Sequence, residues 1–387
     1  MNKEISCITG GRIILENEII DNKAIVFDNK IIDILDKDIF KQKYDSKKIA
    51  LIEAEGKYIS PGFIDVHIHG CGGSDVMDAD ISALKTISYT MAKGGTTSFL
   101  AATMTKDKEN IYKALNSVRD AMKENVKGAR ILGVYLEGPF LSADYTGVHK
   151  KEYILKPDFE FIKCFLDVIK IITIAPEEDA GFEFIKQVKK SSDVILSIGH
   201  TNADYETAVK SIKAGVSGAT HIFNAMRGLH HREPGPAAAI LNAGISYELI
   251  ADTVHVHPVF FQMLLDYKGK DKMILVTDSN RAAYMEEGIW ELGGRKVIVK
   301  NNCARTEDES LAGSVLAMNK AVSNILEHTD LKINEAVNLA SINPARLIGI
   351  DKTKGSIATG KDADMIVFDD KLNVSLSISE GDIIYKA

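Results

Sequence analysis

The sequence predicts an α/β protein that consists of a (β/α)8 TIM-like barrel and a small β-sandwich domain formed from both chain termini. Two observations support this prediction. Residues 59–354 alternate strand-like apolar runs with amphipathic segments of helical length, the pattern of a parallel sheet with crossover helices. Residues 1–58 and 355–387 instead contain short β-branched runs. The simplest arrangement is a barrel inserted between the two halves of one β domain.

Five short β-branched runs predict strands in the first 58 residues, and turn residues such as Asp28-Asn29 separate them. These runs are Ile5–Thr9, Arg12–Leu15, Ala24–Phe27, Lys30–Leu35 and Ile49–Glu53. Their spacing favours a small antiparallel sheet over a βα unit.

Eight further strand-like runs follow Ser60, with helical patterns between most of them. The expected strands are Gly62–His69, Thr96–Thr103, Arg130–Glu137, Ile171–Ala175, Asp193–His200, Gly218–Ile222, Tyr247–Val254 and Met273–Asp278. Between the second and third, Asp107–Asn125 has apolar residues at helical spacing. Eight strands in this rhythm favour a closed barrel, because a doubly wound sheet usually has fewer.

The chain after the eighth strand returns gradually to β character. Trp290–Val299 predicts an inserted hairpin, and helices are expected near Ser314–Glu327 and Ile333–Leu339. Ala363–Phe368 and Leu372–Ile378 predict two more strands, which we assign to the terminal β domain.

The composition limits the possible functions. The chain has 387 residues and a net charge of −7, and this charge argues against a nucleic-acid-binding surface. The four cysteines form no C-x-x-C pair. No signal-peptide pattern and no uncharged apolar stretch of about 18 residues is present, so we expect a reduced, cytoplasmic protein with no membrane span.

Ionisable side chains lie at or near the ends of six of the expected barrel strands, where barrel active sites form. They are His67, His69, Glu137, His200, His221, His255 and Asp278. Random placement would scatter such residues over helices and loops. Their position is therefore the main indication of an enzyme site.

Several of these residues have the chemistry of metal ligands. His67 and His69 are two apart on a strand, so both imidazoles point to one face and can reach one ion. Glu137, His200 and His221 form a His2Glu set, which matches a catalytic zinc site with one position open to water. The alternatives are hydrogen-bonded structural histidines and a carboxylate that forms a salt bridge.

Two other features suggest how a substrate is handled. Asp278 ends the eighth strand, beside the first in a closed barrel, where it can exchange a proton with an activated water. Its alternatives are a metal ligand or a structural carboxylate. The loop 224–235 contains two arginines and two histidines, which suggests an anionic group such as phosphate. A solvated loop or a subunit contact is the alternative.

Several motifs together resemble a known family. Pro61-Gly-Phe-Ile-Asp-Val-His-Ile-His-Gly70 resembles the first barrel strand of the amidohydrolase superfamily. Within that superfamily, a set of motifs in the same order is similar to the N-acetylglucosamine-6-phosphate deacetylase family. These motifs are Leu136–Phe140, Gly199–Ala203, His221–Met226, Arg232–Gly235 and Leu311–Ser314.

The resemblance implies a role for each matching residue. Glu137, His200 and His221 would bind the principal divalent metal, usually zinc or iron, and Asp278 would be the catalytic acid and base. His149 is a candidate donor to the developing oxyanion. Substrate contacts are implied for Val148, His149, Asn224, Ala225, Arg232, His255, Leu311, Ala312, Gly313 and Ser314.

The resemblance also implies a homodimer whose neighbouring subunit contributes to a phosphate site. Because His67 and His69 are both present, a second metal bridged by Glu137 fits this pattern. Ser279-Asn280 departs from the family, in which a small apolar residue such as alanine is common after the aspartate.

The implied reaction is metal-dependent deacetylation of N-acetylglucosamine 6-phosphate to glucosamine 6-phosphate and acetate. One alternative is the epimeric substrate, N-acetylgalactosamine 6-phosphate. Another is a different amidohydrolase, such as a dihydroorotase-like enzyme or an N-acyl amino-acid deacylase. The third is an inactive scaffold barrel, which the intact ligand-type residues disfavour.

Overall fold

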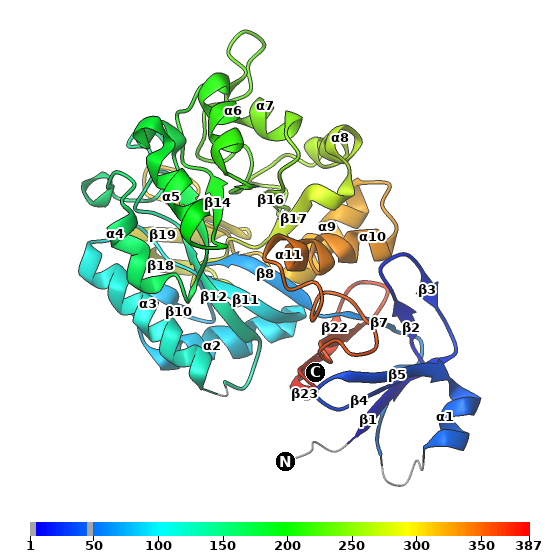
Figure 1. Cartoon of the computed structure of the whole chain (residues 1–387). Coiled ribbons are helices and arrows are strands. Elements are labelled where there is room, and N and C mark those ends of the chain that lie inside the picture. The colour runs from blue at the N-terminus through cyan, green and yellow to red at the C-terminus, as the bar shows by residue number, and fades with distance from the viewer. Residues whose placement is uncertain (1–4, 45–48, 125) are drawn as a thin grey trace.

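The computed structural model describes residues 5–44, 49–124 and 126–387. Helices surround a group of parallel strands, and β-sheets formed by the first and last described segments lie at one end of the molecule (Figure 1). Residues 1–4 and 45–48 of the expected terminal domain lie outside the described residues, as does Asn125, the last residue of the expected helix Asp107–Asn125.

The centre is a parallel sheet in the order β15-β14-β13-β12-β11-β8. Its strands are β8 (Phe63–Ile68), β11 (Thr96–Ala102), β12 (Arg130–Leu136), β13 (Ile169–Ile174), β14 (Ile195–Ile198) and β15 (Gly218–Ala219). A second parallel pair consists of β16 (Tyr247–Ile250) and β17 (Met273–Val276). All eight expected strands are therefore present, with ends that differ from the prediction by a few residues.

Backbone hydrogen bonds link the two parallel sheets beyond the regular strand pairing. The amide N–H of Asp278, after β17, donates to the carbonyl oxygen of His67 on β8 at 2.8 Å. The amide N–H of Ile222, after β15, donates to the carbonyl oxygen of Glu248 on β16 at 2.9 Å. The carboxyl ends of the strands are consequently held together at one end of the sheet.

Amphipathic helices pack around these strands (Figure 1). They are α2 (Ile81–Met91), α3 (Lys108–Lys123), α4 (Phe159–Ile162), α5 (Glu183–Ser191), α6 (Tyr205–Ala214), α7 (Gly235–Asn242), α8 (Val259–Lys268), α9 (Met318–His328), α10 (Ile333–Leu339) and α11 (Ile342–Leu347). Helix α3 begins where the side chain of Asp107 accepts the amide N–H of Asn110, and it buries Ile111, Leu115 and Val118.

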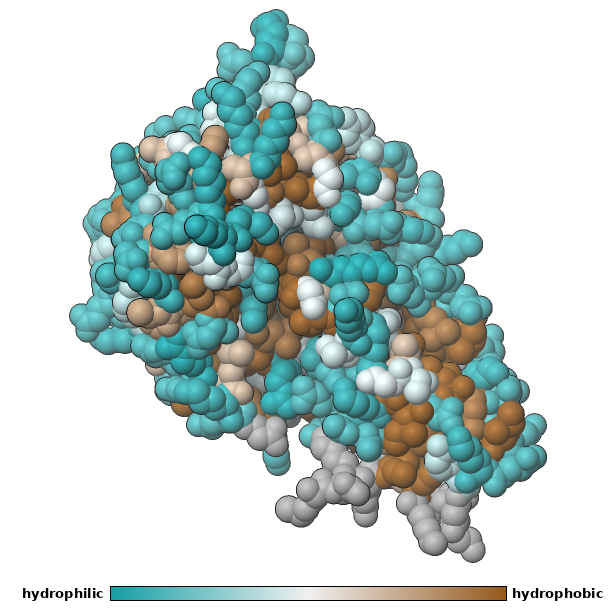
Figure 2. Space-filling view, in the orientation of Figure 1, coloured by the Kyte–Doolittle hydropathy of each residue, from teal (hydrophilic) through white to brown (hydrophobic). Residues whose placement is uncertain are grey.

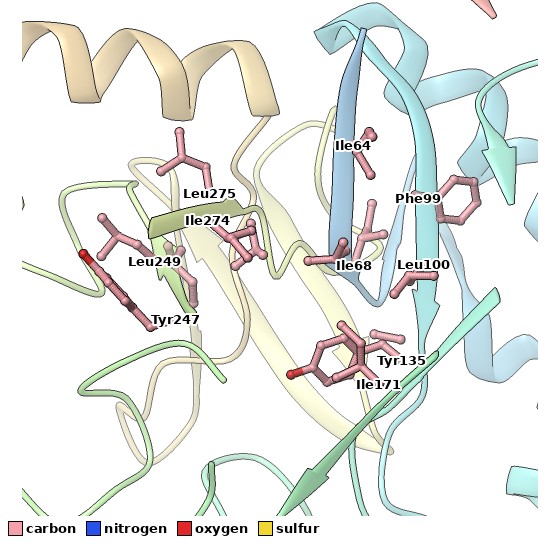
Figure 3. Packing of buried hydrophobic residues seen from close by; sticks show 14 of the residues in the cluster. Ile64, Ile68, Phe99, Leu100, Tyr135, Ile171, Tyr247, Leu249, Ile274 and Leu275 are labelled. Atoms are coloured by element: carbon pink, nitrogen blue, oxygen red, sulfur yellow. The ribbon is translucent and has the colours of Figure 1, made fainter. Parts of the chain in front are cut away.

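The strands are apolar because the interior packs against both of their faces. Residues from the two parallel sheets belong to one hydrophobic cluster, and Figure 3 shows members from β8, β11, β12, β16 and β17 close together. Ile68, Tyr135, Leu249 and Ile274 are each 1% exposed or less. This continuous core fixes the strand ends, and so it determines which side chains can meet there.

The two chain ends form mixed sheets rather than the expected antiparallel one. One sheet has the order β5-β4-β1-β6, with β1 (Ser6–Thr9), β4 (Lys23–Phe27), β5 (Ile31–Asp36) and β6 (Ala50–Glu53). The other has the order β23-β22-β21-β7-β2-β3. Its strands are β2 (Arg12–Ile14), β3 (Ile19–Ile20), β7 (Tyr58–Pro61), β21 (Met365–Phe368), β22 (Val374–Ser379) and β23 (Asp382–Lys386).

Two parallel pairings make the antiparallel prediction wrong. Strand β1 pairs in parallel with β6, and β2 pairs in parallel with β7. A short helix, α1 (Lys37–Lys43), connects β5 to β6 and buries Phe40 beneath the first sheet. Figure 2 shows hydrophobic surface over this part of the molecule. Ile32, Ile39 and Leu51 are exposed hydrophobic residues of its first sheet and of α1 and β6.

The expected hairpin at Trp290–Val299 is a three-stranded antiparallel sheet. It contains β18 (Gly288–Leu292), β19 (Arg295–Lys300) and the unpredicted β20 (Cys303–Thr306). Leu292, Val297 and Ala304 pack with Met104 and Val148, which belong to loops after the parallel strands β11 and β12. The inserted sheet therefore covers one side of the ends of the parallel strands.

Two very short strands, β9 (Gly70–Cys71) and β10 (Ser74–Asp75), pair just after β8.

None of the helices in the described ranges has the length and apolar character that a bilayer crossing requires.

Candidate metal and catalytic site

Five histidines and two acidic residues converge where the parallel strands end. His67 and His69 come from β8 and its end, Glu137 follows β12, His149 lies in the loop after Glu137, and Asp278 follows β17. His200 and His221 follow β14 and β15. All seven side chains are buried, and the most exposed, Asp278, is 7% accessible.

Three of these residues have an uncommon backbone conformation. His200, His221 and Asp278 have positive φ values of 46°, 25° and 47°. Such conformations typically cost about 1–3 kcal/mol each in residues other than glycine, and the surrounding structure must hold them. Backbone strain is thus concentrated where the chain turns these side chains inward.

Hydrogen bonds hold the strained turn at Asp278. Besides the bond from its N–H to His67, its carbonyl oxygen accepts the N–H of Ser314 at 2.7 Å. Ser314 also donates its hydroxyl to the carbonyl oxygen of Thr277 at 2.5 Å. Ser314 is therefore a support for Asp278, behind the site.

Glu137 lies at the centre of the cluster. Its Oε1 is 3.0 Å from His221 Nε2 and 3.2 Å from His200 Nε2. Its Oε2 is 3.1 Å from His69 Nε2 and 3.2 Å from His149 Nε2. His67 Nε2 approaches Oε1 at 3.4 Å. One carboxylate is thus shared by five imidazoles, which come from three strand ends and one loop.

The hydrogen bond of His200 Nδ1 indicates the protonation of its other ring nitrogen, Nε2. His200 Nδ1 lies 2.9 Å from the carbonyl oxygen of Tyr145, which can only accept, so Nδ1 carries the proton. In the neutral ring, Nε2 then has no proton, and its lone pair points toward Glu137 Oε1 and His221 Nε2. The two Nε2 atoms are 3.1 Å apart. Three electron-rich atoms at this spacing fit around a shared cation.

His67 has the same arrangement. Its Nδ1 lies 3.0 Å from Glu248 Oε2, which leaves Nε2 turned toward Glu137 and Asp278. Nε2 is buried and has no hydrogen-bond partner among the residues that the structure describes. An orphaned buried nitrogen beside two carboxylates has the geometry of a metal ligand.

Two groups of side chains can hold a divalent ion. One is Glu137, His200 and His221, and the other is His67, His69 and Glu137; within each group the ligand atoms lie within 4.8 Å of one another. The first matches the predicted His2Glu set. Nitrogen and carboxylate donors of this kind suit zinc or iron.

Burial and the nearby imidazoles have opposite effects on the pKa values of Glu137 and Asp278. Burial raises the pKa of Glu137, but the surrounding imidazoles, His67 first among them, outweigh burial and hold this pKa well below its usual range. Burial also disfavours ionised Asp278, yet His67 and His69 lower its pKa to about 2. Both carboxyl groups are therefore ionised at neutral pH.

His149 is arranged differently from the other histidines. Its Nδ1 accepts the amide N–H of Thr105 at 3.1 Å, so in the neutral ring Nε2 carries the proton. Burial lowers the pKa of His149 to about 4, in spite of the nearby Glu137. Its ring is therefore a neutral hydrogen-bond donor whose N–H points toward Oε2 of Glu137.

A cavity of about 340 Å³ opens onto these residues. Its lining includes seven of the predicted substrate contacts, namely Val148, His149, Asn224, Ala225, His255, Leu311 and Gly313. His255 is held by Asp252, whose Oδ2 lies 2.7 Å from His255 Nδ1. Because one wall contains the proposed metal groups, a molecule in this cavity would lie next to them.

Three predicted substrate contacts lie outside the lining of this cavity. Ala312 is fully buried in the apolar cluster beneath the inserted sheet, and Ser314 supports Asp278 as described above. Arg232 is exposed, and its guanidinium donates to His231 Nε2 at 2.7 Å. Within one chain, then, the structure does not bring Arg232 to the site.

The residues that depart from the family pattern after Asp278 keep this loop in place. Ser279 donates its hydroxyl to the carbonyl oxygen of Gly70 at 3.0 Å. Asn280 donates its side-chain amide to the carbonyl oxygen of Ala312 at 2.8 Å, and it accepts the N–H of Ala282. The polar residues tie the loop to its neighbours.

Sequence reasoning missed some contributors. Glu248 contacts His67 and His221, and Asp252 contacts His255. Glu248 left a signal, since it is the one charged residue in the apolar run Tyr247–Ala251. Met104 and Leu292 also line the cavity, but nothing in their sequence context distinguishes them from ordinary core residues.

The arrangement of a strand-end His/Glu cluster on parallel strands defines a metal-dependent hydrolase class, and the comparisons agree with it. The amidohydrolase family model matches residues 58–384. This chain belongs to the amidohydrolase family.

Relatives within that family are amino-sugar-phosphate deacetylases. N-acetylglucosamine-6-phosphate deacetylase of Bacillus subtilis (strain 168) is 39% identical over 96% of this chain and 95% of that protein. N-acetylgalactosamine-6-phosphate deacetylase of Escherichia coli O157:H7 is 33% identical over 84% of this chain and 87% of that protein. The N-acetylglucosamine-6-phosphate deacetylase structure from Pasteurella multocida has a TM-score of 0.92 at 29% identity, covering 99% of this chain and 100% of that one.

Proposed function

We propose that this chain hydrolyses the acetamide of N-acetylglucosamine 6-phosphate to glucosamine 6-phosphate and acetate. The observation that supports this most is the grouping of Glu137, His200 and His221 beside Asp278 and His149 on one cavity. The site offers metal ligands, an ionised base and a neutral donor together, which are what amide hydrolysis requires. The names of the relatives supply the substrate.

One or two divalent ions would be held by the ligand groups already described. Glu137, His200 and His221 would hold the first, which we expect to be zinc, with iron as the alternative. His67 and His69, together with Glu137, would hold the second. When bound, such an ion lowers the pKa of water toward about 7 and polarises a carbonyl oxygen.

Asp278 accepts a proton from the attacking water and returns it to the leaving amine nitrogen. Its Oδ1 lies 3.2 Å from His69 Nε2 and 3.7 Å from His67 Nε2, so it faces the metal groups. The low pKa of Asp278 keeps it ionised as a base. His149 donates its Nε2–H to the carbonyl oxygen as negative charge develops there.

The phosphate group would bind near the segment 221–225, of which Asn224 and Ala225 line the cavity. His221, Phe223 and Ala225 have positive φ, alternating with Ile222 and Asn224, which do not. Such alternation is the pattern of backbone nests that turn N–H groups toward an anion. His255 lines the same cavity, and binding energy from the phosphate would orient the acetamide at the reacting end.

The exposed position of Arg232 fits the expected homodimer, in which a partner subunit completes the phosphate site. The loop of Arg232 leads into α7, and α7 and α8 form an apolar groove of about 550 Å³. Leu229, Met263 and Tyr267 in this groove are 55%, 55% and 64% exposed. An interface here would bury them, and sedimentation of the purified chain tests it.

We also infer the finer architecture and the location from these features. The eight parallel strands are proposed to close as a (β/α)8 barrel over residues 59–354, with residues 1–58 and 355–387 as a small β-sandwich domain.

The cytoplasm is proposed as the compartment, and the four free cysteines support this.

A panel of substrates tests the function. Acetate release is expected from N-acetylglucosamine 6-phosphate, with much less from N-acetylglucosamine, because the unphosphorylated sugar lacks the group that orients the acetamide. N-acetylgalactosamine 6-phosphate is the second candidate, favoured by the relative from Escherichia coli. Including dihydroorotate and N-acetyl amino acids in the panel tests the other amidohydrolase readings. If the metal-loaded chain hydrolyses none of these compounds, the inactive scaffold is the alternative that remains.

His149 provides a test of the proposed oxyanion donor. Replacing it with phenylalanine removes the N–H while keeping a planar ring, and kcat is expected to fall about 10²–10³-fold. KM is expected to change little, since the interaction strengthens only in the transition state. Steady-state acetate release measures both constants. A kcat near that of the unmodified chain would exclude His149 from this role.

A further inference from the structure

A carboxylate behind the metal groups has no role in the mechanism above. Glu248 lies on β16 and is 2% exposed, between Tyr247 and Leu249, which are both fully buried. An ionised group in such a position is costly unless it is paired and hydrogen-bonded. Its partners therefore indicate why the site contains it.

Both partners of Glu248 belong to metal-ligating residues. Oε2 accepts from His67 Nδ1 at 3.0 Å and from the backbone N–H of His221 at 3.2 Å. The first bond fixes the tautomer of His67, because a carboxylate can only accept. In the neutral ring, Nε2 is then the unprotonated nitrogen, and it is the nitrogen turned toward Glu137.

The ring of His67 is also held in orientation. It stacks on Tyr135 with centroids 4.3 Å apart and an angle of 24° between the planes. Tyr135 is itself tied to Thr220, with their hydroxyl oxygens 2.8 Å apart. Stacking restricts the tilt of the imidazole, and Glu248 selects which of its nitrogens points at the site.

The other histidine of this metal group has no such support. His69 Nδ1 is buried without a hydrogen-bond partner within the described part of the chain. In the group Glu137, His200 and His221, the carbonyl oxygen of Tyr145 fixes His200 Nδ1. His221 Nδ1 also has no hydrogen-bond partner among the described residues, and His221 meets Glu248 through its backbone N–H and not through its ring. The two groups thus depend on Glu248 to different degrees.

We propose that Glu248 is a positioning residue that presents His67 Nε2 to a second divalent ion, and that it thereby decides whether the group His67, His69 and Glu137 is filled. This inference rests on the proposed metal-dependent function. It predicts that loss of Glu248 empties the second position and largely spares the first. Loss of a residue that hydrogen-bonds to a metal ligand typically lowers metal affinity about 10–100-fold.

Zinc titration of the chelator-stripped chain tests this, with bound zinc per chain measured by elemental mass spectrometry. The unmodified chain is expected to bind two ions. E248L should bind the second ion about 100-fold more weakly and the first with little change. E248Q keeps an acceptor oxygen for both partners, so its second affinity should fall only about tenfold.

Asp179→Asn is the matched control. Asp179 is another buried carboxylate, in the loop between β13 and α5, and it accepts two backbone N–H groups of α5 without contacting the metal groups. This variant should bind two ions like the unmodified chain. Anomalous scattering at the zinc edge then assigns the ion retained by E248L to Glu137, His200 and His221.

Three results would overturn the inference. They are a single ion in the unmodified chain, two ions of unchanged affinity in E248L, and equal loss of both ions in E248L while D179N keeps both. If E248L does not fold, E248Q decides by the same criteria. Metal binding without acetate release from the sugar phosphate would refute the proposed substrate and leave the role of Glu248 standing.

Discussion

Asp278→Asn is expected to reduce turnover about 10²–10⁴-fold while metal content and substrate binding stay near those of the unmodified chain. A carboxamide has nearly the same shape and can keep the contacts around Asp278, but it cannot accept a proton from water. The backbone bonds that hold this turn, to His67 and Ser314, do not involve the side chain. Steady-state acetate release and elemental analysis measure the two effects separately.

The comparison with Asp179→Asn separates proton transfer from a general loss of stability. This control removes a buried carboxylate elsewhere and should leave turnover unchanged. Near-normal turnover in Asp278→Asn would remove Asp278 from the role of base. Loss of bound metal in Asp278→Asn would instead make it a ligand, the alternative that the sequence left open.

Glu137→Gln is expected to abolish turnover by a different route. Glu137 belongs to both metal groups and lies within 3.4 Å of five imidazole nitrogens. A neutral amide cannot balance the charge of a divalent ion, and its NH2 group would oppose bound cations. Both ions should therefore be lost together, whereas E248L loses one.

Bound zinc and acetate release, measured on the same preparation of Glu137→Gln, test this prediction. Two bound ions with normal affinity would contradict the central place given to Glu137. Thermal unfolding in the presence of a chelator provides the folding control, because a folded variant should still melt cooperatively.

The parallel strands, and the gathering of ionisable side chains at their ends, could be predicted from the sequence because both depend on local pattern. Parallel strands buried on two faces must be apolar, so an ionisable residue at the end of such a run stands out, as Glu137 and Asp278 do. The two-residue period of a strand placed His67 and His69 on one face. The carboxyl-end rule for barrels then brought strands distant in sequence to one place.

What could not be predicted depends on contacts between distant segments. The parallel pairing of β1 with β6 and of β2 with β7 is set by tertiary packing, and the short β-branched runs alone are compatible with either direction. Cys303–Thr306 became a third strand only because β19 provides an edge for it.

The same limit applies to individual side chains. The sequence does not indicate which ring nitrogen of His149 or of His200 carries the proton, yet Thr105 and Tyr145 give the two rings opposite proton positions. One ring is consequently a donor and the other a ligand. Arg232 had the right charge for a phosphate contact, but its loop directs it away from the cavity of its own chain.

The most direct test is a paired measurement of bound metal and turnover as ions are removed from the chain and returned. Chain stripped of metal by a chelator should release no acetate from N-acetylglucosamine 6-phosphate, and zinc should restore turnover in proportion to the occupancy of Glu137, His200 and His221. Full turnover by a preparation shown to hold no divalent ion would contradict the account.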